Sequence, residues 1–249
     1  MIVLCYINEE FYYRILSKSG ESYKLNSNGN FEGRSRIYRK GIKIFDGYFI
    51  NGKMDGWSFK YYDNGELERK TSYKDGVING HEYEYYSNGK LKAEKFSFKG
   101  RLYAEQIYYS EKGQPTGYWV RDHRDMPNDF LYINYNNSGT IKQVIGTLLS
   151  EEFAVRKNDG FEILRQGNSY KNIDDLYITV ANPPKLKSTF KILVNSKEYI
   201  FSDIKTNTLQ LAGAFTKAGK YAIVGIGTLK DNDKLIKRDT ISVTIIKSI

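Results

Sequence analysis

The stretch "YYDNGELERK", Tyr61 to Lys70, returns almost intact as "YYSNGKLKAE", Tyr85 to Glu94. Both copies contain a tyrosine pair, an Asn-Gly and a Gly-x-Leu, in the same order and with the same spacing. Self-similarity at a fixed period indicates a repeat architecture. The fold of this part of the chain therefore depends on a structural unit whose length is the interval from Tyr61 to Tyr85.

Glycines extend this rhythm well beyond the two copies. One evenly spaced series interleaves with a second series of the same period, so that shorter and longer steps alternate along the chain. The glycines involved are Gly29, Gly41, Gly52, Gly65, Gly76, Gly89, Gly100 and Gly113. Two short segments therefore alternate within each repeat unit.

Asparagine or aspartate precedes most of these glycines. The pairs are Asn28-Gly29, Asn51-Gly52, Asn64-Gly65, Asp75-Gly76, Asn79-Gly80 and Asn88-Gly89. Such pairs tolerate the positive φ angles of type I′ turns, whose twist suits the strands on either side. We predict that the repeat glycines are structural turn residues, namely Gly29, Gly52, Gly65, Gly76, Gly89 and Gly100.

The segments between the turns are typical of β-strands. They are short and rich in Tyr, Phe, Ile and Thr. In "GWSFKYYDNG", Trp57, Phe59 and Tyr61 share one face, and "GHEYEYYSNG" repeats this set in the next unit. Each unit is therefore predicted to be a β-hairpin, and successive hairpins to pair into an antiparallel meander stabilised by cross-strand aromatic pairs.

These residues resemble the MORN repeat, in the variant with Tyr-Tyr-x-Asn-Gly-x-Leu followed by Tyr-x-x-Gly-x-x-x-Gly. "YYDNGEL", "YYSNGKL" and "YKDGVINGH" match it, "YFINGKMDGW" matches its second half, and the resemblance covers about residues 23–119. Bacterial proteins of this family are often labelled antitoxins of toxin–antitoxin pairs. The resemblance implies a protein-binding or membrane-associated scaffold and not an enzyme.

Aromatic usage predicts a domain boundary. Of the 22 tyrosines, 18 precede residue 144, as do both tryptophans. The later part fills its apolar runs with Ile, Val, Leu and Ala, so we expect a repeat domain over residues 1–143 and a second domain over residues 144–249.

The second domain is predicted to be an antiparallel β-sandwich. The expected strands are Leu176–Ala181, Phe190–Val194, Glu198–Phe201, Thr208–Phe215, Lys220–Leu229 and Asp239–Ile246. The segment "AGAFTKAGKYAIVGIGTL" resembles the late-strand hairpin of bacterial immunoglobulin-like domains. The expected fold class is thus all-β, a MORN-type meander followed by an immunoglobulin-like sandwich.

Composition and charge narrow the function classes. The net charge of +9 is spread over both halves without a run of five basic residues, so we expect no nucleic-acid binding. Cys5 is the only cysteine, which excludes an internal disulfide, and it is predicted to be a core residue. The start "MIVLCYINEE" has no basic region, so a cytoplasmic location is expected unless an export signal has been removed.

No catalytic motif is complete. "HRD" at His123 to Asp125 has the first residues of a kinase catalytic loop, but Phe130 stands where that loop has Asn. A metal site built from His123, Asp122 and Asp125 is a minor alternative, and His81 replaces Trp57 in the repeat as a strand residue. Glycoside hydrolysis requires a pair of carboxylates. The regular carboxylates Glu66, Glu68, Glu82 and Glu84 follow the repeat instead of breaking it.

The leading hypothesis is therefore a non-enzymatic scaffold without a cofactor or metal that binds a protein partner, with a toxin as the concrete version. The alternative is a peripheral protein at anionic membrane or glycan surfaces. Rigid tyrosine and tryptophan side chains suit recognition. The candidate partner-binding residues are Trp57, Phe59, Tyr61, Tyr83, Tyr85, Tyr109, Trp119, Arg121, His123 and Arg124.

Overall fold

The computed structural model describes most of the chain. The described backbone comprises residues 2–7, 10–15, 20–98, 101–121, 129–157, 160–164, 167–171, 175–202, 204 and 208–249. Side chains are described for residues 20–97, 105–121, 131–150, 164, 167–171, 175–202, 204 and 208–249. The regular secondary structure in these ranges consists of β-strands, without any helix, so the all-β prediction is confirmed.

The chain forms two compact units. Unit 1 comprises Met1–Thr116 with Asn137–Gly139, and unit 2 comprises Gly117–Asn136 with Thr140–Ile249. The domain boundary that aromatic usage predicts, between residues 143 and 144, falls within β14 (Ile141–Gly146). The predicted domain boundary therefore stays a prediction. The boundary between the two compact units lies after Thr116 instead.

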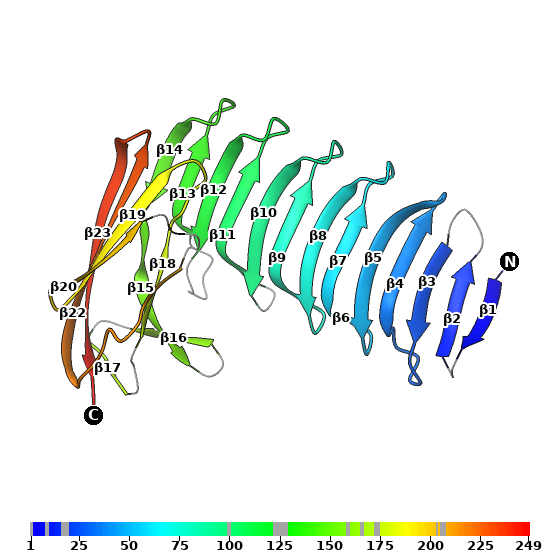
Figure 1. Cartoon of the computed structure of the whole chain (residues 1–249), viewed down its shortest axis with the longest axis horizontal. Helices are drawn as coiled ribbons and strands as arrows, with labels where there is room; N and C mark the ends of the chain where they lie inside the picture. The colour runs from blue at the N-terminus through cyan, green and yellow to red at the C-terminus, as the bar shows by residue number, and fades with distance from the viewer. Residues whose placement is uncertain are drawn as a thin grey trace. The chain divides into compact units, whose positions relative to one another are not determined.

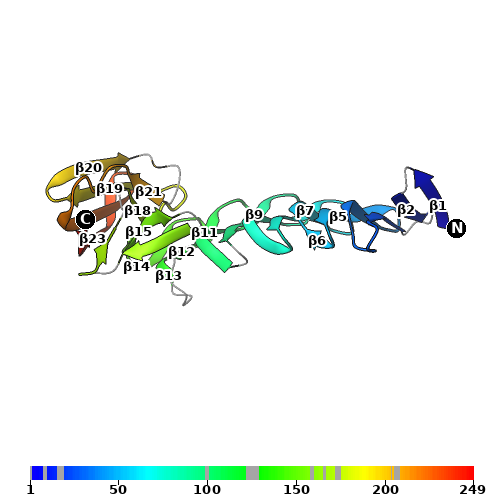
Figure 2. The ribbon, with the colours of Figure 1, turned by 90° about the horizontal axis from the view of Figure 1, so that it is seen from below.

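Unit 1 is an antiparallel meander (Figures 1 and 2). Its strands are β1 (Ile2–Ile7), β2 (Glu10–Ile15), β3 (Gly20–Leu25), β4 (Gly33–Arg39), β5 (Ile42–Ile50), β6 (Lys53–Met54), β7 (Gly56–Tyr61), β8 (Leu67–Lys74), β9 (Val77–Tyr85), β10 (Leu91–Phe98) and β11 (Arg101–Tyr109). They follow one another in sequence order, with β6 paired to β5 beside this path. The predicted run of hairpins is therefore confirmed, and Figure 2 shows β5 to β11 as a single layer.

Two kinds of turn connect these strands. At Asn51-Gly52, φ is +48° and +78°, and Asp75-Gly76 has +51° and +83°, as a type I′ turn requires. At Gly65 only the glycine has positive φ, and its N–H donates to the Tyr62 carbonyl at 2.9 Å. The type I′ prediction is therefore wrong for Asn28-Gly29, Asn64-Gly65 and Asn88-Gly89, which close longer turns with a single left-handed glycine. From Gly52 to Gly89 the two kinds of turn alternate, as the longer and shorter glycine steps do in the sequence.

Asn79-Gly80 is not a turn, contrary to the prediction. The pair lies inside β9, where Gly80 has φ +114° and the register with β8 shifts between Thr71 and Tyr73. A Cβ at Gly80 would lie 3.0 Å from the Ser72 hydroxyl, so glycine allows a close approach at this irregularity. Gly100, the remaining predicted turn glycine, lies outside the described residues.

The two tyrosines of each repeat pair have different structural roles. The first tyrosine, Tyr61 or Tyr85, ends a strand. The hydroxyl of the second one reaches the next unit, because Tyr62 donates to the Tyr85 carbonyl at 2.7 Å and Tyr86 donates to the Tyr109 carbonyl at 2.8 Å. In both cases the hydrogen bond joins one repeat unit to the unit that follows it.

Unit 2 contains three sets of strands. The first is β12 (Pro115–Arg121), β13 (Asp129–Tyr135) and β14, each antiparallel to the next. A four-stranded sheet follows the order β16 (Gly160–Leu164), β15 (Leu149–Lys157), β18 (Leu176–Val180) and β21 (Thr208–Leu211). A five-stranded sheet has the order β17 (Ser169–Tyr170), β23 (Lys234–Lys247), β22 (Gly219–Asp231), β19 (Lys187–Val194) and β20 (Lys197–Ser202).

Each of the six strands predicted for the second domain overlaps an observed strand, from β18 to β23. The pairing differs from the prediction at one place, because β17 runs parallel to β23. The four- and five-stranded sheets share one core, in which a Cβ at Gly227 of β22 would lie 2.7 Å from the Leu149 side chain of β15. Two packed sheets in this region agree with the sandwich architecture that the sequence predicts.

The first set of strands in unit 2 is tied to these two sheets. Tyr118 and Val120 of β12 and Ile133 of β13 are fully buried. The Tyr118 hydroxyl accepts a hydrogen bond from the Asn182 backbone at 2.6 Å, and Asp239 accepts one from the Leu148 backbone at 3.0 Å. Within unit 2, the apolar face of β12 and β13 is therefore shielded from water.

Candidate interaction surface

Strand register brings most of the predicted aromatic residues to one face of unit 1. Phe59 lies opposite Lys70, Lys70 opposite Tyr83, and Tyr83 opposite Glu94 across β7 to β10. Residues two apart on a strand share its face. This face, called the aromatic face below, therefore carries Trp57, Phe59, Tyr61, Lys70, His81, Tyr83, Tyr85, Glu94 and Phe96, and it continues onto β11 with Ile107 and Tyr109.

A stack of rings around one lysine occupies the middle of the aromatic face. The Lys70 ammonium lies 4.1 Å from the ring centroid of Trp57 and 5.8 Å from that of Tyr83, and the two rings stack at 6.3 Å. His81 stacks on Tyr83 at 5.7 Å and meets Phe96 edge-on at 5.1 Å. Trp57 keeps 39% of its surface exposed, so the stack is preorganised and still open to a partner.

Three tyrosines of this face, Tyr83, Tyr85 and Tyr109, keep their hydroxyl protons at neutral pH. Burial raises the pKa of Tyr83, Tyr85 and Tyr109, and the negative charge of Glu94 raises each of them further. Protonated phenols offer hydrogen-bond donors beside large apolar rings. These three tyrosines thus supply side chains of the kind that a recognition surface needs.

Of the remaining candidates, two belong to unit 2 and two lie outside the described residues. Trp119 and Arg121 are on β12 of unit 2, where the Trp119 ring packs against Tyr132 at a centroid distance of 5.0 Å. His123 and Arg124 lie outside the described residues, as do Asp122 and Asp125 of the alternative metal site. Their roles stay predictions.

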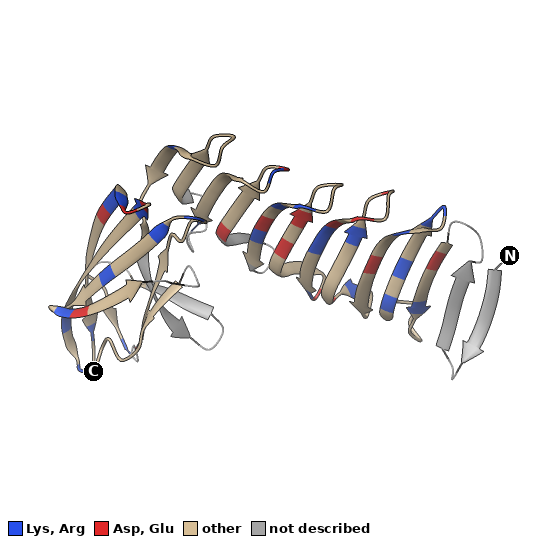
Figure 3. Cartoon of the chain, turned by 45° about the horizontal axis from the view of Figure 1, so that its top comes forward, with Lys and Arg blue, Asp and Glu red and all other residues tan. Residues whose placement is uncertain are grey.

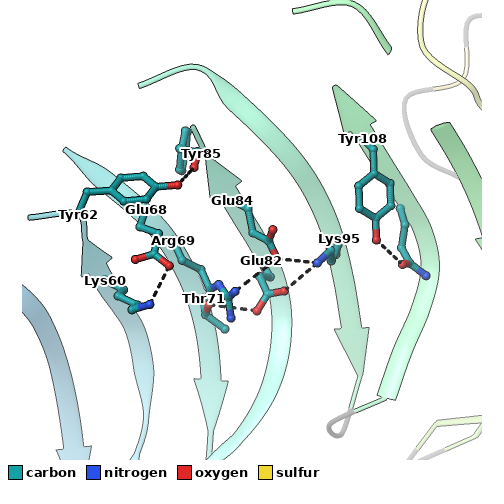
Figure 4. A network of polar contacts seen from close by, with 11 residues as sticks. Lys60, Tyr62, Glu68, Arg69, Thr71, Glu82, Glu84, Tyr85, Lys95 and Tyr108 are labelled. Atoms are coloured by element: carbon teal, nitrogen blue, oxygen red, sulfur yellow. Dashed lines mark hydrogen bonds and ion pairs between the residues drawn. The ribbon is translucent and has the colours of Figure 1, made fainter. Parts of the chain in front are cut away.

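The opposite face of unit 1 carries a ladder of ion pairs, and we call it the charged face (Figure 4). Lys60 contacts Glu68 at 2.7 Å, and Lys95 contacts Glu84 at 2.6 Å. Lys95 also lies 3.7 Å from Glu82, whose carboxylate accepts a hydrogen bond from Thr71 at 3.3 Å. Arg69 completes the ladder at 3.6 Å from Glu84.

Three of the four regular carboxylates, Glu68, Glu82 and Glu84, are thus engaged with cations. Burial alone would raise the pKa of Glu84, but the hydrogen bond and charge of Lys95 outweigh it and hold the pKa below its usual value. A general acid in glycoside hydrolysis needs a raised pKa instead. The geometry therefore gives Glu82 and Glu84 a structural part in holding neighbouring strands together.

A cationic cluster at one end of the aromatic face was not anticipated from the sequence. Asp46 of β5 is 2% exposed, and its carboxylate accepts two hydrogen bonds from Arg34, at 2.7 and 2.8 Å. Lys43 lies 3.2 Å and Arg36 3.6 Å from the same carboxylate. The alternation in Arg34-Ser35-Arg36 was the available signal, since residues two apart on a strand share a face. Figure 3 shows the bands of basic and acidic residues along these strands.

The charges of this cluster are mutually stabilised. Burial by itself would raise the pKa of Asp46, but hydrogen bonds from Arg34 and Lys43 together hold it below its usual value. The hydrogen bond to Asp46 raises the pKa of Arg34. The pKa of Lys43 is raised mainly by its contact with the Tyr61 hydroxyl and to a smaller extent by Asp46. Arg34, Lys43 and Asp46 therefore stay ionised across the neutral range.

Within the described ranges, no group of three or more His, Cys, Asp or Glu side chains is placed to hold a metal ion. The same part of the chain has no helix long and apolar enough to cross a membrane.

Comparison with known proteins gives no family. No protein-family model matches the chain, and no curated protein matches it. Among solved structures, it is similar to the extracellular domain of the hybrid two-component system BT3049 from B. thetaiotaomicron, at 10% identity and TM-score 0.30, over 98% of this chain and 44% of that one. It is also similar to a Ca2+-stabilized adhesin with which an Antarctic bacterium binds ice, at 10% identity and TM-score 0.25, over 99% of this chain and 65% of that one. The chain spans less than two thirds of either structure, and TM-scores this low carry no argument about fold or function.

Proposed function

We propose that this protein is a non-enzymatic interaction protein in which a MORN-type ribbon, followed by an immunoglobulin-like sandwich, binds a protein partner through the aromatic face. The stack of Trp57, Lys70, Tyr83 and His81 carries the proposal. Its rings are fixed by one another, so binding costs little side-chain entropy, and aromatic side chains commonly dominate interface energies.

Neutralisation of a toxin, as by an antitoxin or immunity protein, is the concrete version of this function. The support is the resemblance of the repeat to proteins that bear the antitoxin label. The charged face supports it in another way, because its ion pairs satisfy one another and leave the aromatic face as the more available surface.

A pull-down from the native host tests the proposal. The full chain should recover a protein in stoichiometric amount, and the variant Trp57→Ala/Tyr83→Ala should lose it. The matched control is Tyr199→Ala, which removes a tyrosine from β20 of unit 2. Failure of the unaltered chain to enrich any protein, or equal recovery by the aromatic variant, would contradict the proposed function.

The alternative function is a peripheral protein at an anionic membrane or glycan surface. The observation that favours it is the cationic cluster of Arg34, Arg36 and Lys43. Liposome flotation with acidic lipid separates the two functions. Attraction to anionic lipid falls steeply between low and moderate salt because it is screened over about 8–10 Å.

A further inference from the structure

The aromatic face carries an excess of positive charge over β4 to β8. Besides Lys53 of β6, four cations lie on this face by strand register among the described residues of these strands, and one carboxylate, Asp46, opposes them. Lys74 at the end of β8 does not add to the excess, because it is paired with Asp55 at 2.8 Å. The four cations are Arg34, Arg36, Lys43 and Lys70.

The charged face has no such imbalance. The cations of its ladder, Lys60, Arg69 and Lys95, are matched by the three carboxylates Glu68, Glu82 and Glu84. The ladder lies on β7 to β10 and the cationic cluster on β4 and β5, so the two sets of charges occupy different strands of unit 1 as well as different faces.

The buried carboxylate of Asp46 holds the charged groups of three cationic side chains close together. It is enclosed, whereas the Arg34, Arg36 and Lys43 side chains remain 56%, 37% and 33% exposed. A guanidinium has five N–H donors, of which Arg34 uses two on Asp46, so donors remain for an incoming anion. One carboxylate cannot neutralise three cations, and a second anion would meet a preorganised site.

Apolar rings adjoin this cluster. The Lys43 ammonium lies 4.6 Å from the centroid of Tyr61, and Phe59 is the cross-strand neighbour of Asp46. Tyr48, on the strand of Asp46 and two positions away, is among the most exposed aromatic side chains. A ligand at the cluster would therefore touch cations and rings at the same time.

We propose that the partner presents an acidic polypeptide segment, whose carboxylates bind Arg34, Arg36 and Lys43 while its aromatic or aliphatic side chains pack on Tyr48, Phe59 and Tyr61. This inference rests on the proposed function and specifies the chemistry of the partner. Carboxylate is favoured because the cluster already holds one in the paired geometry that arginine provides. The excess positive charge also speeds association with an acidic surface.

A defined probe tests the inference with the full chain. Binding of a random Glu–Tyr copolymer is measured at about 0.15 M salt, where attraction between exposed charges more than about 8 Å apart is largely screened. Arg36→Gln/Lys43→Gln should weaken binding roughly tenfold, since each exposed ion pair contributes a factor of about 1.4 to 5. The control Lys60→Gln/Arg69→Gln makes the same change of charge on the charged face and should leave binding within about twofold of the unaltered chain.

Thermal unfolding of both double variants separates a binding defect from a folding defect. Arg36→Gln and Lys43→Gln leave the Arg34–Asp46 pair in place, so unit 1 should remain folded. Equal losses in the two double variants, or no loss in either, would overturn the inference. Binding to phosphatidylserine vesicles is measured in parallel. If Arg36→Gln/Lys43→Gln loses vesicle binding but keeps copolymer binding, the cluster binds a membrane, and the inference of an acidic polypeptide partner is overturned as well.

The inference and the proposed function fail in different ways. A host partner that is lost with Trp57→Ala/Tyr83→Ala but kept with Arg36→Gln/Lys43→Gln leaves the function standing and refutes the acidic segment. Copolymer binding that depends on the cluster, with no host partner recovered, refutes the function and leaves only an affinity for acidic chains.

Discussion

The substitution Asp46→Asn tests how the cationic cluster is held in place. Asparagine keeps the shape of the side chain and removes its charge, so Arg34, Arg36 and Lys43 lose their common partner. All three cations are partly exposed, and exposed ion pairs contribute about 0.2–1 kcal/mol each. Asp46→Asn should therefore lower the free energy of unfolding of unit 1 by roughly 1–3 kcal/mol at neutral pH.

The effect should depend on pH in a defined direction. The pKa of Asp46 is held below its usual value in the folded protein. A carboxyl with a lowered folded pKa stabilises the fold fully above its unfolded pKa of about 3.9, and this contribution is lost as pH falls through the folded pKa. The difference between Asp46→Asn and the unaltered chain should thus be full at pH 7 and disappear at strongly acidic pH.

Urea unfolding followed by tryptophan fluorescence measures this difference. The chain has two tryptophans, so Trp119→Phe makes Trp57 of unit 1 the only reporter. With a slope of about 1–3 kcal/mol per M, the urea midpoint should fall by roughly 1 M. Equal stability of the two proteins at pH 7, or a loss of the same size at pH 7 and at acidic pH, would refute the reasoning.

Three further substitutions test the packing of the two units. Tyr62→Phe removes the hydrogen bond to the Tyr85 carbonyl and should destabilise unit 1 by about 0.5–1.5 kcal/mol in the same urea assay, whereas an unchanged midpoint would argue against its linking role. Gly76→Ala forces alanine to φ +83° and should cost about 1 kcal/mol, measured by thermal unfolding, and a neutral effect would contradict the turn assignment. Gly227→Ala places a Cβ 2.7 Å from Leu149 and should destabilise unit 2 by about 1–3 kcal/mol in calorimetry, and a stabilised variant would refute the close packing of its sheets.

Much of unit 1 could be predicted from local sequence alone. Positive φ is unfavourable for most residue types, so the pairs Asn51-Gly52 and Asp75-Gly76 correctly predicted two turns. Asn79-Gly80 shows where this reasoning stops. The same dipeptide lies inside β9, because the strand opposite brings Ser72 close to Gly80 and the register shifts there.

The candidate surface could be predicted only in part. Alternation placed Trp57, Phe59 and Tyr61 on one face, since the side-chain period of a strand is two. It could not show that Lys70 lies over the rings of both Trp57 and Tyr83, because that contact requires the register of β8 against both neighbours.

The sequence by itself determined the β-hairpin repeat, most of its turn positions and six strands of the second domain, β18 to β23, because turn chemistry and side-chain alternation act over a few neighbouring residues. Tertiary structure alone decided which charges meet. Asp46 and Arg34 are 12 residues apart in sequence and join through cross-strand pairing. That pairing gathers Arg34, Arg36 and Lys43 around one buried carboxylate on β4 and β5, an arrangement that depends on long-range register and that composition cannot express.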